Sequence, residues 1–573
     1  MKVRNWMVLM FSFCLATTIN AQDSVPENWF NLDKSTSNVQ GVSTEKVYTD
    51  IIKSNKGRTV IVAVIDSGVD AEHEDLKEVM WVNPKEIAGN GIDDDGNGYI
   101  DDIHGWNFIG GKDGKNVKED NLEVARVYKK FHAKFDGKSA AQISGKDQKD
   151  YIIYLKAKKE IEEGRETASA SLAQFESMKS IILESLEAVD AALEGKKPTL
   201  ENIQNLKPGA NQSLGIGQSV MVDILGQGGA FETIEEVKED MKGQLQEAVD
   251  HFSNQLDFGL NPDFDARKVI GDNYANQTER FYGNNDVEGP DARHGTHVAG
   301  IIGAIRDNDI GVNGVADNVR IMSIRAVPDG DERDKDVANA IRYAVDNGAS
   351  IVNMSFGKGF SWNKKVVDDA VRYAAKKDVL LVHAAGNSNM EVEPDNNFPN
   401  DKYEKKKLFG KKKAPNWIEV GALHWKGGED AVASFSNYDQ ENVDLFAPGV
   451  AIHSTVPDNK YENLQGTSMA SPVVAGVAAV LRSHFPKLTA KQVKSILLDS
   501  TVPLNQDVIK PGADGAKVPF KTLSVTGGVV NAYNAVQKAA KVKGKKKIRK
   551  GGGSSGVRSV NGGSATKKKK DQA

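Results

Sequence analysis

The stretch GTSMASP at residues 466–472, followed by VVAGVAAVL at 473–481, organises the rest of this chain. Its small residues predict a tight turn that carries one serine, Ser468, directly into a buried, alanine-rich helix. The first amide groups of a helix lack intrahelical acceptors and favour negative charge, as in the oxyanion of an acyl-transfer intermediate. Most serines at this position only cap the helix, so catalysis also requires a base, a carboxylate and an oxyanion donor.

The bulk composition indicates a globular protein. Of 573 residues, 39% are hydrophobic and 27% charged, with a formal net charge of −5. These values are ordinary for a globular chain of two or more domains. They give no reason to expect nucleic acid as a partner.

The first 21 residues predict export. Lys2 and Arg4 precede an apolar run at 6–15 and a small-residue segment, which is the pattern of a cleavable secretory signal peptide. A retained membrane anchor is the alternative. We expect a periplasmic or extracellular protein that has no membrane contact after cleavage. The sole cysteine, Cys14, lies in this segment, so the mature protein must gain stability from its core or from bound metal.

A strand-rich pattern interrupted by helices defines the expected domains. Six apolar, mostly β-branched residues precede Asp66, and strand and helix patterns alternate again after residue 285. This predicts a doubly wound parallel sheet with helices on both faces, and Asp66 at the carboxyl end of a strand. The expected divisions are a signal peptide at 1–21, an N-terminal arm at 22–47, a catalytic domain at 48–105 and 285–540, a helical insertion at 106–284 and a basic, disordered Gly/Ser/Lys-rich tail at 541–573.

The predicted insertion carries a long apolar stripe. Hydrophobic residues recur every three or four positions between Leu172 and Leu193, which predicts a long amphipathic helix. Thr233 and Glu236 form the pattern of a capping box for another helix. The stripe can pack within the insertion, against the main domain or against a partner.

An acidic loop at 93–102 predicts a first metal site. Asp93, Asp95 and Asn97 alternate, and Asp101 follows Gly98, which suits a hard cation such as calcium. The same residue types also form ordinary turns.

Four motifs in fixed order resemble those of subtilisin-like serine proteases, the subtilases of peptidase family S8. They are VIDSGVD at 64–70, HGTHVAG at 294–300, AAGN at 384–387 and GTSMASP at 466–472. The resemblance implies a subtilisin-like fold and a serine endopeptidase of broad specificity, which acts on proteins or peptides without an organic cofactor.

The resemblance also implies a role for each matching residue. Ser468 is the nucleophile, and His294 is the general base. Asp66 orients the imidazole, and Asn387 donates to the oxyanion together with the N–H of Ser468. The substrate-binding residues implied in this way are Ser355, Phe356, Gly357, Ala385 and Gly386.

A second calcium site is implied by the loop at 308–316, which resembles the tight metal loop of the family. Asn308 would supply its side chain and Ile310 and Val312 their carbonyls, with Asp75 as the completing carboxylate. A bare glycine turn is the alternative.

The sequence is compatible with more than one function for the chain and for its insertion. A narrow processing protease competes with a scavenging one, and an inactive scaffold that binds partners through calcium is a rival of a different class. The insertion would cap the active site, gate it or assist folding. The segment before the first strand is shorter than the usual family propeptide, and the oligomeric state is not predicted.

Overall fold

The computed structural model describes residues 25–55, 57–404 and 412–546, and these form two compact units. One unit contains Glu119–Asp265, and the other contains Val25–Lys118 together with the chain from Ala266 onward. The predicted signal peptide and the tail beyond residue 546 lie outside the described residues. Within the described part of the chain, no helix is long and apolar enough to cross a membrane.

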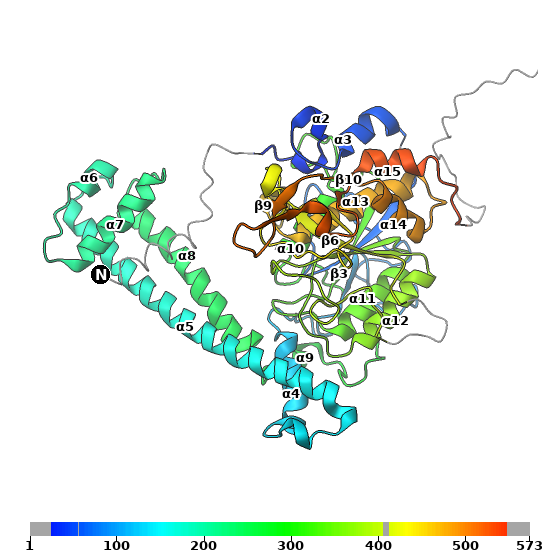
Figure 1. Ribbon diagram of the computed structural model, residues 1–573, viewed down its shortest axis with the longest axis horizontal. Helices are drawn as coiled ribbons and strands as arrows, with labels where there is room; N and C mark the ends of the chain where they lie inside the picture. Colours follow the sequence, from blue (N-terminus) through cyan, green and yellow to red (C-terminus); the bar gives the residue numbers. More distant parts are fainter. Residues whose placement is uncertain (1–24, 56, 405–411, 547–573) are drawn as a thin grey trace, which may run out of the picture. The chain divides into compact units, whose positions relative to one another are not determined.

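The larger unit is built around a nine-stranded, mostly parallel sheet (Figure 1). In spatial order its strands are β10 (Val502–Pro503), β13 (Gly528–Val529), β7 (Leu445–Pro448), β6 (Trp417–Leu423), β5 (Leu380–Ala384), β4 (Ile351–Met354), β1 (Val60–Asp66), β3 (Val319–Arg325) and β2 (Gly105–Asn107). Only β10 runs antiparallel to its neighbour, and β1, β4 and β5 end side by side at one edge. This is the edge at which parallel sheets place their functional residues.

Helices cover both faces of this sheet, as predicted. On one face α10 (Arg293–Gly303) and α13 (Thr467–His484) share a core with alternate residues of the central strands. Figure 1 shows α11 (Asp334–Asp346) and α12 (Lys364–Lys376) on the other side of the sheet. Among the described residues of this unit, the remaining α-helices longer than three residues are α2 (Lys34–Ser37), α9 (Arg267–Ile270), α14 (Ala490–Asp499) and α15 (Ala532–Ala539).

The predicted N-terminal arm is part of the core of the larger unit. Trp29 and Phe30 are fully buried, and the Trp29 indole donates to the carbonyl of Ala451. At the other end of the chain, residues 541–546 lie against the region of α14, where Gln492 donates to the carbonyl of Lys543 and the amide of Lys546 donates to that of Lys487. The disorder predicted for the tail therefore does not begin at residue 541.

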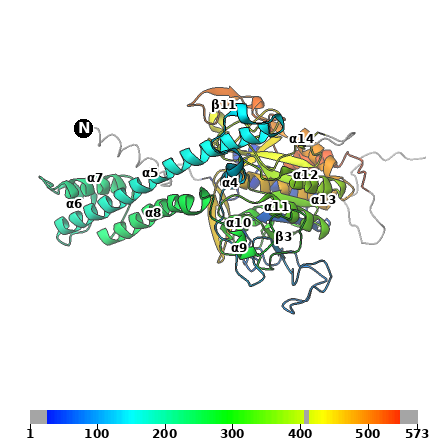
Figure 2. The same ribbon diagram turned by 90° about the horizontal axis from the view of Figure 1, so that it is seen from below.

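The second unit is helical and contains its own apolar core. Its helices are α4 (Glu123–Phe135), α5 (Gln148–Leu193), α6 (Leu200–Gln204), α7 (Gln212–Gly226) and α8 (Ile234–Asn254). Figures 1 and 2 both show α8 running alongside α5. The stripe predicted between Leu172 and Leu193 packs against α7 and α8, which is the intramolecular outcome. Thr233 caps α8 as predicted, but the Glu236 carboxylate accepts from the amide of Glu232 instead of closing the capping box.

The helical unit is shorter than the predicted insertion of 106–284. Residues 106–118 and 266–284 belong to the larger unit because they are bound to its sheet and helices. Trp106 and Asn107 lie in β2, which pairs with β3. Arg267 and Tyr282 both hydrogen-bond to the buried carboxylate of Asp336 on α11.

Candidate active site

A histidine and a carboxylate meet at the carboxyl end of β1. Asp66 is the last residue of β1, and its Oδ1 lies 2.7 Å from Nδ1 of His294 in the first turn of α10. Gly295 permits this approach, because a Cβ atom on it would lie 2.0 Å from the carbonyl oxygen of Gly68. The pair leaves Nε2 as the ring nitrogen that can exchange a proton with another group.

The electrostatics of the pair favour the protonated imidazole. Burial disfavours the imidazolium, but the charge and hydrogen bond of the Asp66 carboxylate outweigh this effect and raise the pKa of His294. The other histidine of the motif, His297, is fully buried, and burial lowers its pKa to about 3. Its Nε2 lies 3.0 Å from the carbonyl oxygen of Ile452. His297 is therefore a structural residue, and His294 is the candidate base.

Ser468, the serine of the 466–472 motif, is the one partly exposed residue of a buried helix. Every residue of α13 is buried except Ser468, which lies in the first turn. Its amide is one of the helix N–H groups that have no intrahelical acceptor. Its hydroxyl donates to the carbonyl of Ser355 at 3.2 Å, and among the described residues it makes no hydrogen bond to His294. The structure thus joins His294 to Asp66 directly, whereas the Ser468 hydroxyl is turned toward the β4 end.

A chain of buried hydroxyl and amide groups fixes the position of Ser468. Ser471 Oγ donates to Asn353 Oδ1 at 2.7 Å, and Asn353 Nδ2 donates to Ser355 Oγ at 2.9 Å. Ser355 Oγ in turn donates to the carbonyl of Ser468 at 2.8 Å. The end of β4 is therefore tied to the first turns of α13.

Asn387 is held beside the same turn. Its Oδ1 accepts from both the amide and the hydroxyl of Thr467, each at 2.9 Å. These two donors fix the amide orientation, so Nδ2 is free to donate elsewhere. Gly386 also donates its amide to the Thr467 hydroxyl. The AAGN segment after β5 is thereby attached to the residue that precedes Ser468.

The five predicted substrate-binding residues follow two neighbouring strands. Ser355, Phe356 and Gly357 come directly after β4, and Ala385 and Gly386 come directly after β5. Because β4 and β5 are parallel neighbours, both segments leave the same edge of the sheet. Ser355 contacts Ser468 itself, as described above, so these segments flank the candidate nucleophile.

Comparison with known proteins agrees with this geometry. The family model described as the Subtilase family matches residues 57–534. The chain belongs to the subtilase family. A thermophilic serine proteinase from Bacillus sp. (strain AK1) is 37% identical over 245 residues, which are 42% of this subtilase and 54% of that protein. Subtilisin DY from Bacillus licheniformis is 36% identical over 245 residues, 42% of this chain and 80% of its own.

A solved cold-adapted subtilisin-like serine proteinase is 31% identical to this subtilase, with a TM-score of 0.33 over 42% of this chain and 77% of that structure. The present chain spans about half of the Bacillus sp. (strain AK1) proteinase and four fifths of subtilisin DY.

The predicted second metal loop surrounds a buried carboxylate. Asp75 is fully buried, accepts from Asn308 Nδ2 at 2.8 Å and from the Val312 amide at 3.0 Å, and has no Lys or Arg ion pair among the described residues. Burial raises the pKa of Asp75, although these hydrogen bonds oppose the shift. Gly311 is required here, since its φ is +52° and a Cβ would lie 2.4 Å from Asp75 Oδ2.

The loop also borders a cavity. A cavity of about 370 Å³ is lined by residues 307–313 together with Glu27 and Asn28 from the N-terminal arm. Asp75 is a buried carboxylate without a Lys or Arg partner among the described residues, and a hard cation fits such a group. Asp75, Asn308, Ile310 and Val312 are thus brought together, and the arm residues are an addition that the sequence did not indicate.

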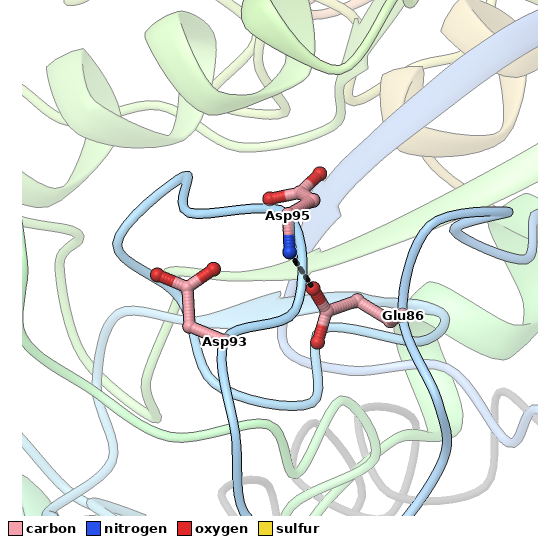
Figure 3. Close-up of side chains that lie close together, drawn as sticks. All are labelled: Glu86, Asp93 and Asp95. Atoms are coloured by element: carbon pink, nitrogen blue, oxygen red, sulfur yellow. Dashed lines mark hydrogen bonds between the residues drawn. The ribbon is translucent and has the colours of Figure 1, made fainter.

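The acidic loop is only partly assembled as predicted (Figure 3). Asp93 and Asp95 lie with Glu86 in a group whose carboxylate oxygens are within 4.8 Å of one another. Glu86 Oε1 accepts from the Asp95 amide, and its Oε2 is buried without a hydrogen-bond partner in the described structure, which fits a cation. Asp101 lies outside this group, because its carboxylate accepts from the amides of Asn90 and Gly91.

Asn97 of the same loop donates to Asp102 and accepts from the Tyr99 amide. Glu86 was missed because it precedes the alternating pattern by seven residues, and nothing in the local sequence connects it to Asp93. Asn353 and Ser471 were missed for a similar reason, since only the fold brings β4 to α13.

Proposed function

We propose that this protein is an exported, calcium-stabilised serine endopeptidase of broad specificity. The observation that carries the proposal is the 2.7 Å contact between His294 Nδ1 and Asp66 Oδ1 at the strand edge from which the Ser355 segment reaches Ser468. The named relatives are serine proteinases, which supports the same chemistry.

In the proposed reaction, Ser468 Oγ attacks the carbonyl carbon of the scissile peptide bond. Nδ1 of His294 is engaged by Asp66, so Nε2 accepts the proton from the hydroxyl. The Asp66 carboxylate stabilises the imidazolium that forms, in agreement with the raised pKa of His294. Productive attack requires the Ser468 side chain to rotate from the Ser355 carbonyl toward His294, a rearrangement of one χ1 angle.

The tetrahedral oxyanion would accept hydrogen bonds from the Ser468 amide and from Asn387 Nδ2, whose amide orientation is fixed by the two hydrogen bonds that Oδ1 accepts from Thr467. Collapse of the tetrahedral intermediate breaks the C–N bond of the scissile peptide, and His294 gives the proton to the leaving amine. Water then attacks the acyl-enzyme by the same route and regenerates the Ser468 hydroxyl.

Extended peptide would bind between the segments that follow β4 and β5. Backbone groups along such segments pair with any peptide sequence, which supports broad endopeptidase specificity. The charged and apolar pattern of residues 1–21 supports export, and the absence of cysteine after Cys14 fits an exported chain stabilised without disulfides.

Calcium is the cation that best suits both metal loops, because their donors are carboxylate, amide and carbonyl oxygens. Asp75, Asn308, Ile310 and Val312 would hold one ion, and Asp93, Asp95 and Glu86 would hold another, with Asn97 and Asp101 supporting the second loop. In this proposal the ions stabilise the fold and take no part in peptide hydrolysis.

The test is casein hydrolysis by the purified mature chain and by its Ser468→Ala variant, each with calcium and with chelator. We expect casein hydrolysis by the unaltered mature chain and none by Ser468→Ala, and we expect chelator to reduce the activity of the unaltered chain. Equal activity in the Ser468→Ala variant would refute the proposed mechanism. Activity of the first protein that survives complete calcium removal at high temperature would refute calcium stabilisation while leaving the mechanism intact.

A further inference from the structure

A buried polar cluster lies directly behind the substrate-binding segments. His383 on β5 and Glu419 on β6 are both buried, and His383 Nδ1 lies 2.9 Å from Glu419 Oε1. Trp417 donates its indole N–H to Glu419 Oε2 at 2.7 Å. His383 Nε2 has no hydrogen-bond partner among the described residues. None of these groups takes part in the proposed reaction, and burying them costs free energy unless hydrogen bonds compensate.

The cluster fixes the amide of Asn397. Asn397 Nδ2 donates to Glu419 Oε1 at 3.2 Å and to the carbonyl of Ala385 at 3.4 Å. The reverse orientation would point the amide oxygen at these two acceptors, so the direction of the amide is determined by its neighbours. Asn397 Oδ1 is left without a donor in the part of the chain that the structure describes.

This free oxygen faces the substrate-binding segment. A Cβ atom placed on Gly357 would lie 3.3 Å from Asn397 Oδ1, 3.4 Å from the carbonyl oxygen of Phe398 and 3.8 Å from His383 Cε1. Gly357 is two residues beyond Ser355, whose carbonyl accepts from the Ser468 hydroxyl. Two oxygen atoms therefore lie beside Gly357, and of these the Phe398 carbonyl already accepts from the amide of Lys358 at 2.9 Å.

We propose that Asn397 is a specificity-determining residue that makes this protease favour substrates whose P1 side chain ends in a hydrogen-bond donor. This inference rests on the proposed endopeptidase function, which places the P1 side chain between the segments at 355–357 and 385–386. An amide or amine at the end of P1 would satisfy Asn397 Oδ1. An aliphatic side chain of the same length would bury this oxygen without a partner.

The test compares peptide anilides that differ only at P1, with Gln and Met as donor-bearing and apolar side chains of similar length. For the unaltered protein we expect a higher kcat/KM for Gln than for Met. In Asn397→Ala the Gln-to-Met ratio should fall by about 3- to 10-fold, the value of one neutral hydrogen bond. A ratio measured on one preparation does not depend on the fraction of active enzyme. Asn396→Ala, whose side chain bonds the amide of Glu393 and the carbonyl of Glu391, is the matched control and should leave the ratio unchanged.

A higher kcat/KM for Met in the unaltered protein, or an unchanged ratio in Asn397→Ala, would overturn the inference. If Asn397→Ala does not fold, the Gln-to-Met ratio of kcat/KM in the unaltered protein is itself the test of the inference. A serine-directed fluorophosphonate separates the two proposals. Labelling of Ser468 together with a preference for Met would refute only the specificity, whereas absence of labelling would refute the endopeptidase function itself.

Discussion

Asp66 determines the protonation behaviour of the candidate base. Its carboxylate raises the pKa of His294 above the ordinary value despite the opposing effect of burial. Because His294 must be neutral to accept the serine proton, activity should rise with pH as the imidazolium loses its proton. The acidic limb of the kcat/KM profile is therefore expected at a higher pH than an unperturbed histidine would give.

Asp66→Asn tests this interpretation. The substitution removes the anion that favours the imidazolium, so the pKa of His294 should fall and the acidic limb should move to lower pH. The kcat should decrease by about four orders of magnitude, the general size of this effect in serine proteases, because the amide holds the wrong tautomer. Peptide hydrolysis as a function of pH checks both statements. An acidic limb that stays in place in the variant would show that another group titrates.

At the residue scale, the motif residues could be predicted because each belongs to a short continuous pattern. Asp66, His294, Asn387 and Ser468 are identified in this way before the fold is known. Asn397 and Glu419 could not be identified, since their importance comes from the pairing of β5 with β6 and from the position of Gly357.

At the scale of elements, the close approach of α10 to β1 depends on Gly295. A methyl group at this position would meet the carbonyl oxygen of Gly68 and the Asp66 side chain, so Gly295→Ala must shift the helix that carries His294. We expect a loss of about 1–3 kcal/mol in the free energy of unfolding and a decrease in kcat/KM.

Thermal unfolding and peptide hydrolysis of Gly295→Ala provide the measurement. Gly243→Ala is the matched control, because Gly243 lies within α8 and a Cβ there would have no heavy atom within 4 Å. The control should be neutral or slightly more stable. A Gly295→Ala variant as stable and active as the unaltered protein would contradict the described packing.

The metal loops provide a second prediction at this scale. Calcium at 100 times its dissociation constant should stabilise the folded state by about 2.7 kcal/mol per site, and chelator should lower Tm accordingly. Asp75→Asn should lose a large part of the calcium-dependent change in Tm, because the loop at 308–312 then lacks its buried carboxylate.

Calorimetry with calcium and with chelator tests this prediction. Asp395→Asn, which makes the same charge change at an exposed position, is the control and should keep the full response. If Asp75→Asn responds to calcium as the unaltered protein does, Asp75 is not a ligand. A Glu86→Gln variant applies the same test to the other loop.

Helices and strands with a regular spacing of apolar residues could be predicted, because burial of one or both faces produces that spacing in the sequence. The stripe ending at Leu193 belongs to α5, which begins much earlier, at Gln148. Its first part is more polar, and two of its five buried positions are the alanines Ala157 and Ala168, so the apolar periodicity did not locate the start of the helix.

At the scale of the whole molecule, the chain combines two units whose cores are separate. The candidate catalytic residues and both proposed metal loops lie in the larger unit, whereas the helical unit packs its own apolar stripe. A variant in which a flexible Gly/Ser linker replaces residues 119–265 should therefore fold and hydrolyse short peptides.

Removal of 106–284, the boundaries expected from the sequence, should instead abolish folding. It would delete β2 and the contacts of Arg267 and Tyr282 with Asp336, leaving a buried carboxylate without those partners. Circular dichroism and peptide hydrolysis of the two deletion variants test the difference. Equal behaviour of the two variants would refute the boundaries described here.

The composition change near residue 106 marks where the pattern becomes charged, but it could not show that both flanks of the insertion return to the sheet.

The most direct test of the proposed activity is labelling of the mature chain by a serine-directed fluorophosphonate, with the modified residue located by mass spectrometry. We expect a single adduct on Ser468, formed rapidly in the unaltered protein and much more slowly in His294→Ala, with no adduct at this position in Ser468→Ala. Failure of the folded, unaltered protein to form an adduct on Ser468, or equal labelling rates with and without His294, would contradict this expectation.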